Sequence, residues 1–221
     1  MKAPKLYIFS GLGADHRVFQ LMDFGPYEIH HIKWITPIER ESIEAYTLRI
    51  SKQITTENPV LVGLSFGGMM AMEVAKIMPS ATVILLASAK TRNELPLYFK
   101  VAGKLGLHHL LPLSLLTGSN FMTNWFFGAK SPAEKHLLAQ ILGDIDHVFL
   151  KWAIHQIVNW QNSTIPAATL HIHGSADRIL PIRYTKPDII IPGGNHFMTF
   201  NQSKELSLYI QNYLRGISFV K

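Results

Sequence analysis

Residues 59 to 70 read Pro59-Val60-Leu61-Val62-Gly63-Leu64-Ser65-Phe66-Gly67-Gly68-Met69-Met70, and this stretch decides the fold. A run typical of a buried strand leads into Gly-x-Ser-x-Gly, and a helical pattern follows as far as Lys76. A serine between such a strand and such a helix lies on a sharp turn, the nucleophile elbow, which exposes its hydroxyl. Gly63 and Gly67 fit because a side chain at either position would crowd the turn. The stretch predicts that Ser65 is a nucleophile; an ordinary strand-to-helix loop is the alternative.

The composition indicates one globular domain with room for an inserted subdomain, because 48% of the 221 residues are hydrophobic and 16% are charged. The sequence has no apolar run long enough for a membrane span, so we expect no membrane association. The apolar run Leu6-Tyr7-Ile8-Phe9 is too short for a signal peptide and is needed as a strand. We therefore expect a cytoplasmic protein.

Cysteine and charge exclude several function classes. The sequence has no cysteine, which excludes disulfides, thiolate catalysis and cysteine metal sites. The net charge is +6, but the basic residues are scattered singly, so we expect no nucleic-acid partner. No group of His, Asp and Glu has the spacing of metal ligands, and the glycines do not form a dinucleotide fingerprint. We expect no metal and no cofactor.

Apolar strands alternate with helical patterns along most of the chain, which implies βαβ units and a mostly parallel sheet. The predicted strands cover residues 6–9, 27–34, 59–62, 82–87, 169–173 and 188–191. The predicted helices cover residues 41–56, 68–78 and 202–214.

The segment from about Thr91 to Gln161 breaks this alternation and is rich in helical patterns and prolines. It follows the strand after the elbow, where an insertion would cover the carboxyl ends of the strands, the usual ligand side. We expect a core of residues 1–90 and 162–221 and a helical cap of residues 91–161. We expect most cap aromatics to form the cap's own core and a few to face the pocket; they are Tyr98, Phe99, Phe121, Trp125, Phe126, Phe127, Phe149, Trp152 and Trp160.

A serine hydroxyl needs a base to take its proton, and histidine is the usual base because its pKa lies near neutrality. His196 follows a strongly apolar strand and lies on the glycine-rich loop Gly193-Gly194-Asn195, from which it can reach over the sheet edge. We predict that His196 is the base. Surface or structural roles are expected for His30, His31, His108, His109, His136, His147, His155, His171 and His173.

The imidazole in turn needs a carboxylate that fixes its tautomer and supports its charged form. Asp177 lies on a turn just past a predicted strand, so we predict that it is this acid. Asp146 is a rival, but it lies in the middle of the cap with no strand behind it. Asp188 would start a strand and point away. A solvated turn aspartate is the structural alternative for Asp177.

Acyl transfer also requires hydrogen-bond donors for the oxyanion that develops on the substrate carbonyl. The first expected donor is the backbone N–H of Phe66, the residue after the nucleophile. The second is expected from the loop after the first strand, and we choose the Leu12 N–H because Gly11 and Gly13 let the backbone approach closely. Gly13 and Ala14 remain alternatives.

Ser65, Asp177 and His196 follow one another in the chain order of the α/β-hydrolase fold, and the chain resembles that superfamily from Leu6 to its last helix. The resemblance implies a doubly wound α/β fold with a helical cap insertion and the usual nucleophile, acid and base roles. This chain has Ser10-Gly11 where the family often has His-Gly, and it lacks the usual first pair of antiparallel strands. We therefore expect a mostly parallel sheet of about six strands. A serine nucleophile argues against the dehalogenase branch.

The combined motifs predict a serine hydrolase that cleaves a small, largely apolar carboxylic ester or thioester through an acyl-enzyme intermediate. Acyltransferases, lyases and carbon–carbon bond hydrolases use the same scaffold, and a fold does not determine chemistry. A non-catalytic small-molecule binder is a further alternative. We expect a monomer or homodimer whose partner is a small ester-like substrate.

Overall fold

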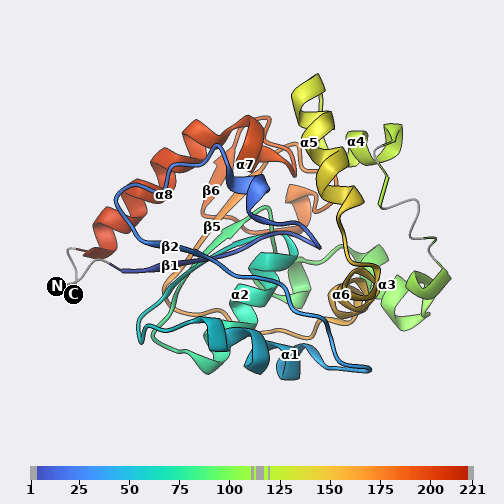
Figure 1. Ribbon diagram of the computed structural model, residues 1–221, viewed down its shortest axis with the longest axis horizontal. Helices are drawn as coiled ribbons and strands as arrows, with labels where there is room; N and C mark the ends of the chain where they lie inside the picture. The colour runs from blue at the N-terminus through green and yellow to red at the C-terminus, as the bar shows by residue number, and fades with distance from the viewer. Residues whose placement is uncertain (1–3, 111, 113–116, 119, 219–221) are drawn as a thin grey trace.

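A computed structural model describes residues 4–110, 112, 117–118 and 120–218 (Figure 1). Its strands form one six-stranded sheet in the order β2-β1-β3-β4-β5-β6, and every neighbouring pair is parallel. The strands are β1 (Leu6–Phe9), β2 (Ile29–His31), β3 (Val60–Leu64), β4 (Thr82–Leu86), β5 (Thr169–Gly174) and β6 (Ile189–Ile191). The prediction of an α/β fold with about six parallel strands is confirmed.

Helices cover both faces of the sheet, which explains why the central strands are apolar throughout. The helices α1 (Ile43–Ile50) and α2 (Phe66–Ile77) lie on one face, and α8 (Ser203–Ser218) lies on the other (Figure 1). Tyr7 and Phe9 pack into the core on the α1 and α2 side. Leu6 and Ile8 alternate with them and pack into the core on the α8 side. The short helices η1 (His16–Phe19), η6 (Ile182–Tyr184) and α7 (Met198–Asn201) complete this part of the chain.

Two predicted elements are shorter than expected. The helix predicted for residues 41–56 ends at Ile50 and continues as the 3-10 turn η2 (Ser51–Gln53). After this turn, the Gln53 side chain accepts from the Lys33 N–H and donates to the Lys33 carbonyl, both at 2.9 Å. The strand predicted for residues 27–34 covers only Ile29–His31, an edge strand whose side chains are all exposed.

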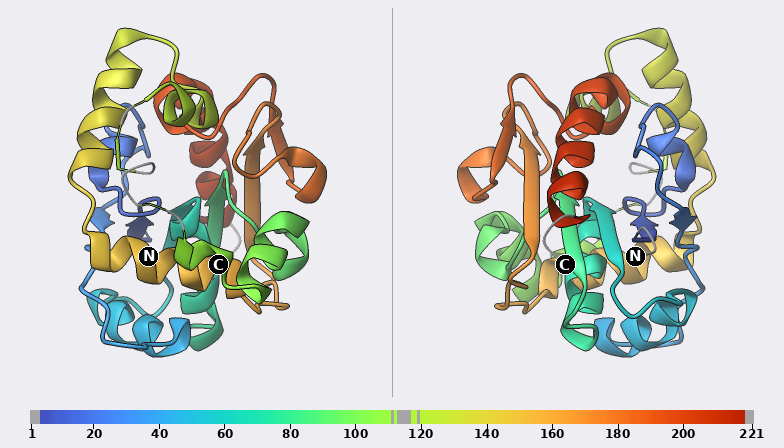
Figure 2. Two further views of the ribbon diagram at one scale, coloured as in Figure 1. Left: turned by 90° about the vertical axis from the view of Figure 1, so that its right-hand side faces the viewer. Right: turned by 90° about the vertical axis from the view of Figure 1, so that its left-hand side faces the viewer.

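Between β4 and β5, the described residues form a series of helical elements. They are η3 (Arg92–Glu94), α3 (Leu97–Lys104), η4 (Leu107–Leu110), α4 (Phe121–Phe127), α5 (Pro132–Gly143) and α6 (His147–Asn159). Figure 2 (left) shows α5 on one side and α3 on the other, with α6 between their lower ends. We call residues 91–161 the insertion; its division from the core at these boundaries stays a prediction. None of the described helices has the length and apolarity needed to cross a bilayer.

The large aromatic side chains of α6 and of Trp160, which directly follows it, correct one expectation. Phe149, Trp152 and Trp160 are buried in the main core beside the sheet, where they join residues of α1 and α2. They are therefore not part of a separate core within the insertion. Their burial follows from contacts distant in sequence, because the Trp152 indole donates to the Glu41 carbonyl at 2.7 Å and the Trp160 indole to Glu73 at 2.8 Å.

Candidate active site

Ser65 occupies the sharp turn between β3 and α2 that the Gly-x-Ser-x-Gly pattern predicts. Its backbone has φ 54° and ψ −121°, which side-chain-bearing residues rarely adopt and which costs about 1–3 kcal/mol. The end of β4 and the residues after it hold this conformation, because the Ser65 N–H donates to the Leu86 carbonyl at 2.9 Å and the Ser88 hydroxyl donates to the Ser65 carbonyl at 2.7 Å. Although Ser65 is the N-cap of α2, its hydroxyl does not cap the helix. The hydroxyl is therefore available for another partner.

The glycines around Ser65 bring the start of α2 into direct contact with β1. A Cβ on Gly67 would overlap the backbone of Phe9 and Ser10, and a Cβ on Gly63 would overlap the backbone of Gly68. The chain crossing at this point requires bare backbone, as the sequence predicts. It also places the loop that follows β1 next to Ser65.

His196 and Asp177 complete one hydrogen-bonded chain with Ser65. The His196 Nε2 atom lies 2.9 Å from the Ser65 Oγ, and its Nδ1 atom lies 2.7 Å from the Asp177 Oδ2. The residues come from the turn after β3, the turn after β5 and the loop after β6, which all emerge at one edge of a parallel sheet. The structure therefore brings together the three side chains that the sequence selected.

The environment of Asp177 keeps its carboxylate charged. Burial alone would raise the pKa of Asp177, but the charge and hydrogen bond of His196 outweigh this effect and hold the pKa below its usual value. The Asp177 Oδ1 also accepts from the N–H groups of Ile179 and Leu180, both at 2.9 Å. These bonds fix the carboxylate in the orientation that meets the imidazole.

Two further histidines lie close to Asp177, and the sequence already placed both on a strand beside the proposed acid, in a structural role. The His173 Nε2 donates to the Leu180 carbonyl at 2.8 Å, and the His171 Nε2 lies 3.2 Å from the His173 Nδ1. Burial lowers the pKa of both rings, so they are neutral at pH 7 and the 3.6 Å approach of His173 to Asp177 is not an ion pair. The His-x-His spacing on β5 was the available signal, because residues two apart share a strand face.

The proposed oxyanion donors lie in suitable segments. Phe66 is the first residue of α2, so its N–H has no carbonyl partner within the helix. The Gly11 loop passes close to the nucleophile, since a Cβ added to Gly11 would lie 3.8 Å from the Ser65 Cβ. A turn in this loop is closed by the Ala14 N–H and the Gly11 carbonyl at 3.1 Å, and the Leu12 N–H takes no part in that bond.

The rival acids have other structural roles. Asp146 caps α6 by accepting from the Phe149 N–H at 2.8 Å. Asp188 accepts from the His171 N–H at 2.7 Å and pairs with Lys90. Both carboxylates are therefore engaged with partners other than the His196 imidazole.

The insertion contributes to the site on the His196 side. The Phe127 ring of α4 packs edge-on against the His196 ring at a centroid distance of 5.7 Å. The Asn195 side chain donates to the Gly128 carbonyl at 2.9 Å, which links the loop carrying His196 to the end of α4. Sequence alone did not show which aromatic of the insertion reaches the site.

Aromatic rings from three segments meet beside the elbow. Phe66 packs against Trp34 at 5.7 Å, Phe149 at 6.1 Å and Trp152 at 6.0 Å between ring centroids. Phe66 immediately follows Ser65, so these contacts hold the elbow against α6.

Comparison with known proteins gives a family match and several similar folds. A model of the alpha/beta hydrolase family matches residues 9–207. A bromoperoxidase from Bacillus anthracis is 18% identical, with a TM-score of 0.70 over 96% of this chain and 92% of that chain. A carboxylesterase from Nitrososphaera gargenis is 10% identical, with a TM-score of 0.73 over 98% of this chain and 92% of that one.

A third similar structure is a meta-cleavage product hydrolase from Pseudomonas fluorescens IP01, which is 14% identical, with a TM-score of 0.69 over 98% of this chain and 92% of that chain. Identities this low show a common fold and leave substrate and reaction open. A comparison with curated protein sequences gave no match.

Proposed function

We propose that this chain, which belongs to the alpha/beta hydrolase family, is a serine hydrolase that cleaves a small, largely apolar carboxylic ester or thioester. One observation carries the proposal: the Ser65 hydroxyl, the His196 imidazole and the Asp177 carboxylate form a continuous chain of hydrogen bonds at 2.9 and 2.7 Å. These residues lie 131 and 19 positions apart, so their meeting is a property of the fold.

In the proposed reaction, the Ser65 Oγ attacks the acyl carbonyl while the His196 Nε2 accepts the hydroxyl proton. The imidazolium that forms is stabilised by Asp177 on its other nitrogen. His196 then donates the proton to the departing alcohol or thiol, which leaves the acyl group on Ser65. Water deprotonated by His196 attacks this acyl-enzyme, releases the carboxylic acid and restores the serine.

The proposed oxyanion site uses the backbone N–H groups of Phe66 and Leu12. The Phe66 N–H is at the positive end of α2, which favours a developing negative charge. The loop that carries Leu12 lies next to Ser65, because the neighbouring Gly11 approaches the serine side chain closely. The Gly13 N–H of the same turn is the alternative donor.

A preference for apolar acyl groups is supported by the side chains near the nucleophile. Phe127 contacts the His196 ring, and Leu12 packs partly buried against the aromatic core. A charged acyl group would lose its water next to these side chains without gaining a partner of opposite charge.

Replacement of Ser65 by alanine tests the proposal. For p-nitrophenyl acetate and butyrate, kcat should fall by about 10⁴–10⁶-fold in Ser65→Ala if the three groups act as a unit. Ser163→Ala is the matched control, because Ser163 is exposed and lies outside the site. Unchanged ester hydrolysis by Ser65→Ala would refute the proposed nucleophile.

Two further measurements separate the alternative reactions. A fluorophosphonate probe should label wild type at Ser65 and leave Ser65→Ala unlabelled, which a non-catalytic binder would not show. Product analysis with and without an acceptor alcohol then distinguishes hydrolysis from acyl transfer. A transesterified product that dominates in water would replace the hydrolase proposal by a transferase.

A further inference from the structure

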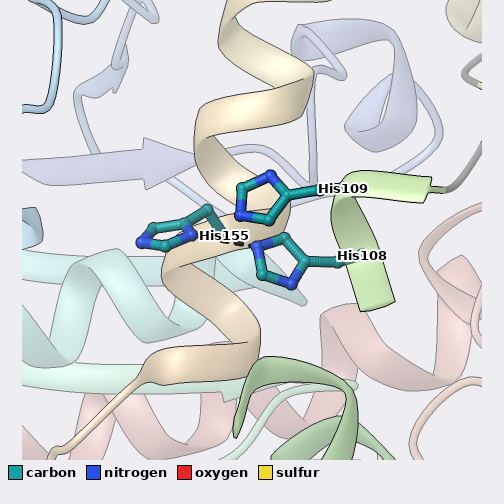
Figure 3. Close-up of side chains that lie close together, drawn as sticks. All are labelled: His108, His109 and His155. Atoms are coloured by element: carbon teal, nitrogen blue, oxygen red, sulfur yellow. Dashed lines mark hydrogen bonds between the residues drawn. The ribbon is translucent and has the colours of Figure 1, made fainter. Parts of the chain in front are cut away.

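Three histidines gather on the insertion (Figure 3), and none of them belongs to the Ser65–His196–Asp177 chain. His108 and His109 belong to η4, and His155 belongs to α6. Each offers one ring nitrogen, and these nitrogens all lie within 4.8 Å of one another. His108 is buried, whereas the other two are exposed and accessible to an ion from solvent. The proposed acyl transfer uses none of them.

The spacing of the ring nitrogens is close to that of metal ligands. The His108 Nε2 and the His155 Nδ1 are 2.9 Å apart and share one proton. Two nitrogens bound to a tetrahedral zinc ion at about 2.0–2.1 Å lie about 3.3–3.4 Å apart. An ion can therefore replace the shared proton if this pair separates by a few tenths of an ångström. The exposed ring of His109 must then turn inward to supply the third nitrogen.

The backbone that carries the three rings is held in place by packing between helices. The helix α3 directly precedes η4 and packs so tightly on α6 that a Cβ on Gly103 would overlap the Val158 carbonyl. The contact holds η4 against α6. The backbone that carries the three rings is therefore preorganised, and binding requires only side-chain adjustments.

One outer contact orients the His108 ring within the cluster. The His108 Nδ1 faces the Ala102 carbonyl at 3.5 Å. This is the outer contact that commonly orients a metal-binding imidazole with its Nε2 toward the ion.

We propose that His108, His109 and His155 form a binding site for a divalent transition-metal ion of the zinc class, with a fourth coordination position open to solvent. Imidazole nitrogen suits Zn²⁺, Cu²⁺ and Ni²⁺, whereas Mg²⁺ and Ca²⁺ take oxygen ligands. This site departs from the sequence-based expectation of no metal. The bound ion would join η4 to α6 and thereby reinforce the insertion.

Zinc titration of the full-length protein without a histidine tag tests this proposal. After chelator treatment, wild type should bind one Zn²⁺ per chain by isothermal titration calorimetry. Zinc at a hundredfold excess over Kd should raise Tm by about 5–10 °C, because a ligand that binds only the folded state stabilises it. Mg²⁺ at the same concentration should leave Tm unchanged.

Two ligand variants and one control locate the ion. His155→Gln and His109→Gln replace exposed side chains, so both should fold, and each should bind zinc more than tenfold more weakly. His136→Gln is the control, because His136 is exposed on α5 of the same insertion and lies outside the cluster. It should keep the affinity of wild type.

Two results would overturn the proposal. One is the absence of one-to-one zinc binding to wild type when the zinc concentration reaches about a hundred times the Kd of an ordinary micromolar site. The other is either ligand variant that keeps the affinity of wild type, which would place the zinc elsewhere on the chain. Ser65→Ala should bind zinc as wild type does, so the result does not depend on the proposed hydrolase activity.

Discussion

Replacing Asp177 by asparagine removes one charge behind His196 and leaves the size of the side chain unchanged. The amide oxygen can still accept from the N–H groups of Ile179 and Leu180, so the turn after β5 should keep its shape. The amide nitrogen would then face the His196 Nδ1 and donate to it. This reverses the tautomer, puts the ring proton on Nε2, and prevents His196 from accepting the proton of Ser65.

The size of the effect follows from the geometry of the pair. The His196 Nδ1 and the Asp177 Oδ2 are 2.7 Å apart and both side chains are buried. Full charges about 4 Å apart interact by about 4 kcal/mol at an effective dielectric constant near 20. Because each 1.36 kcal/mol is tenfold in rate, loss of the charge alone lowers kcat by about 10³-fold. The wrong tautomer adds to this, so we expect about 10³–10⁴-fold.

The assay is steady-state hydrolysis of p-nitrophenyl butyrate at pH 7.5 by wild type, Asp177→Asn and Asp146→Asn. Asp146→Asn is the matched control, because asparagine caps a helix about as well as aspartate. It should keep kcat within a few fold. Folded Asp177→Asn with kcat within tenfold of wild type would refute the role of Asp177, as would an equal loss in Asp146→Asn.

Two contacts outside the Ser65–His196–Asp177 chain give the remaining predictions. Asn195→Ala loses the bond to the Gly128 carbonyl that positions the loop after β6. In hydrolysis of the same ester, kcat should therefore fall about tenfold with little change in KM. An unchanged kcat would contradict this role. Glu134 accepts from the N–H groups of Lys130 and Ser131, and although burial alone would raise its pKa, these bonds hold the pKa below its usual value. The folded state therefore binds fewer protons than the unfolded state, so this stabilisation is present above the unfolded pKa and is lost as pH falls. In urea denaturation, Glu134→Gln should lower the unfolding free energy by about 1 kcal/mol at pH 7 and by almost nothing at pH 3. Equal losses at both pH values would contradict the role given to the charge of Glu134.

Local signals made the elbow and the order of the strands predictable. Gly-x-Ser-x-Gly between an apolar strand and a helix leaves few conformations open, because the close approach of Gly67 to the backbone of β1 tolerates no side chain. His196 and Asp177 were predictable because each follows a strand, and the ends of parallel strands meet at one edge. Their catalytic roles stay predictions until the variants are measured.

Features that depend on distant contacts were not predictable from local patterns. The bonds between Gln53 and Lys33, which follow the end of α1, are of this kind, because a helical pattern does not reveal them. The three-histidine cluster joins His108 to His155 across 47 residues, so no ligand spacing is visible in the sequence. The packing of α6 against the main core likewise depends on contacts between residues far apart in the sequence.

The position of Phe149 and Trp152 limits how the insertion can be exchanged between relatives. A chimera cut at residues 91 and 161 would replace the rings that pack against Phe66 and Tyr46 in the main core, and loss of one such ring typically costs about 3–5 kcal/mol. Crossing over before α6 instead would transplant α3, α4 and α5 and leave these rings in place. Recombination aimed at new substrate ranges should therefore take α6 and the sheet from the same parent protein.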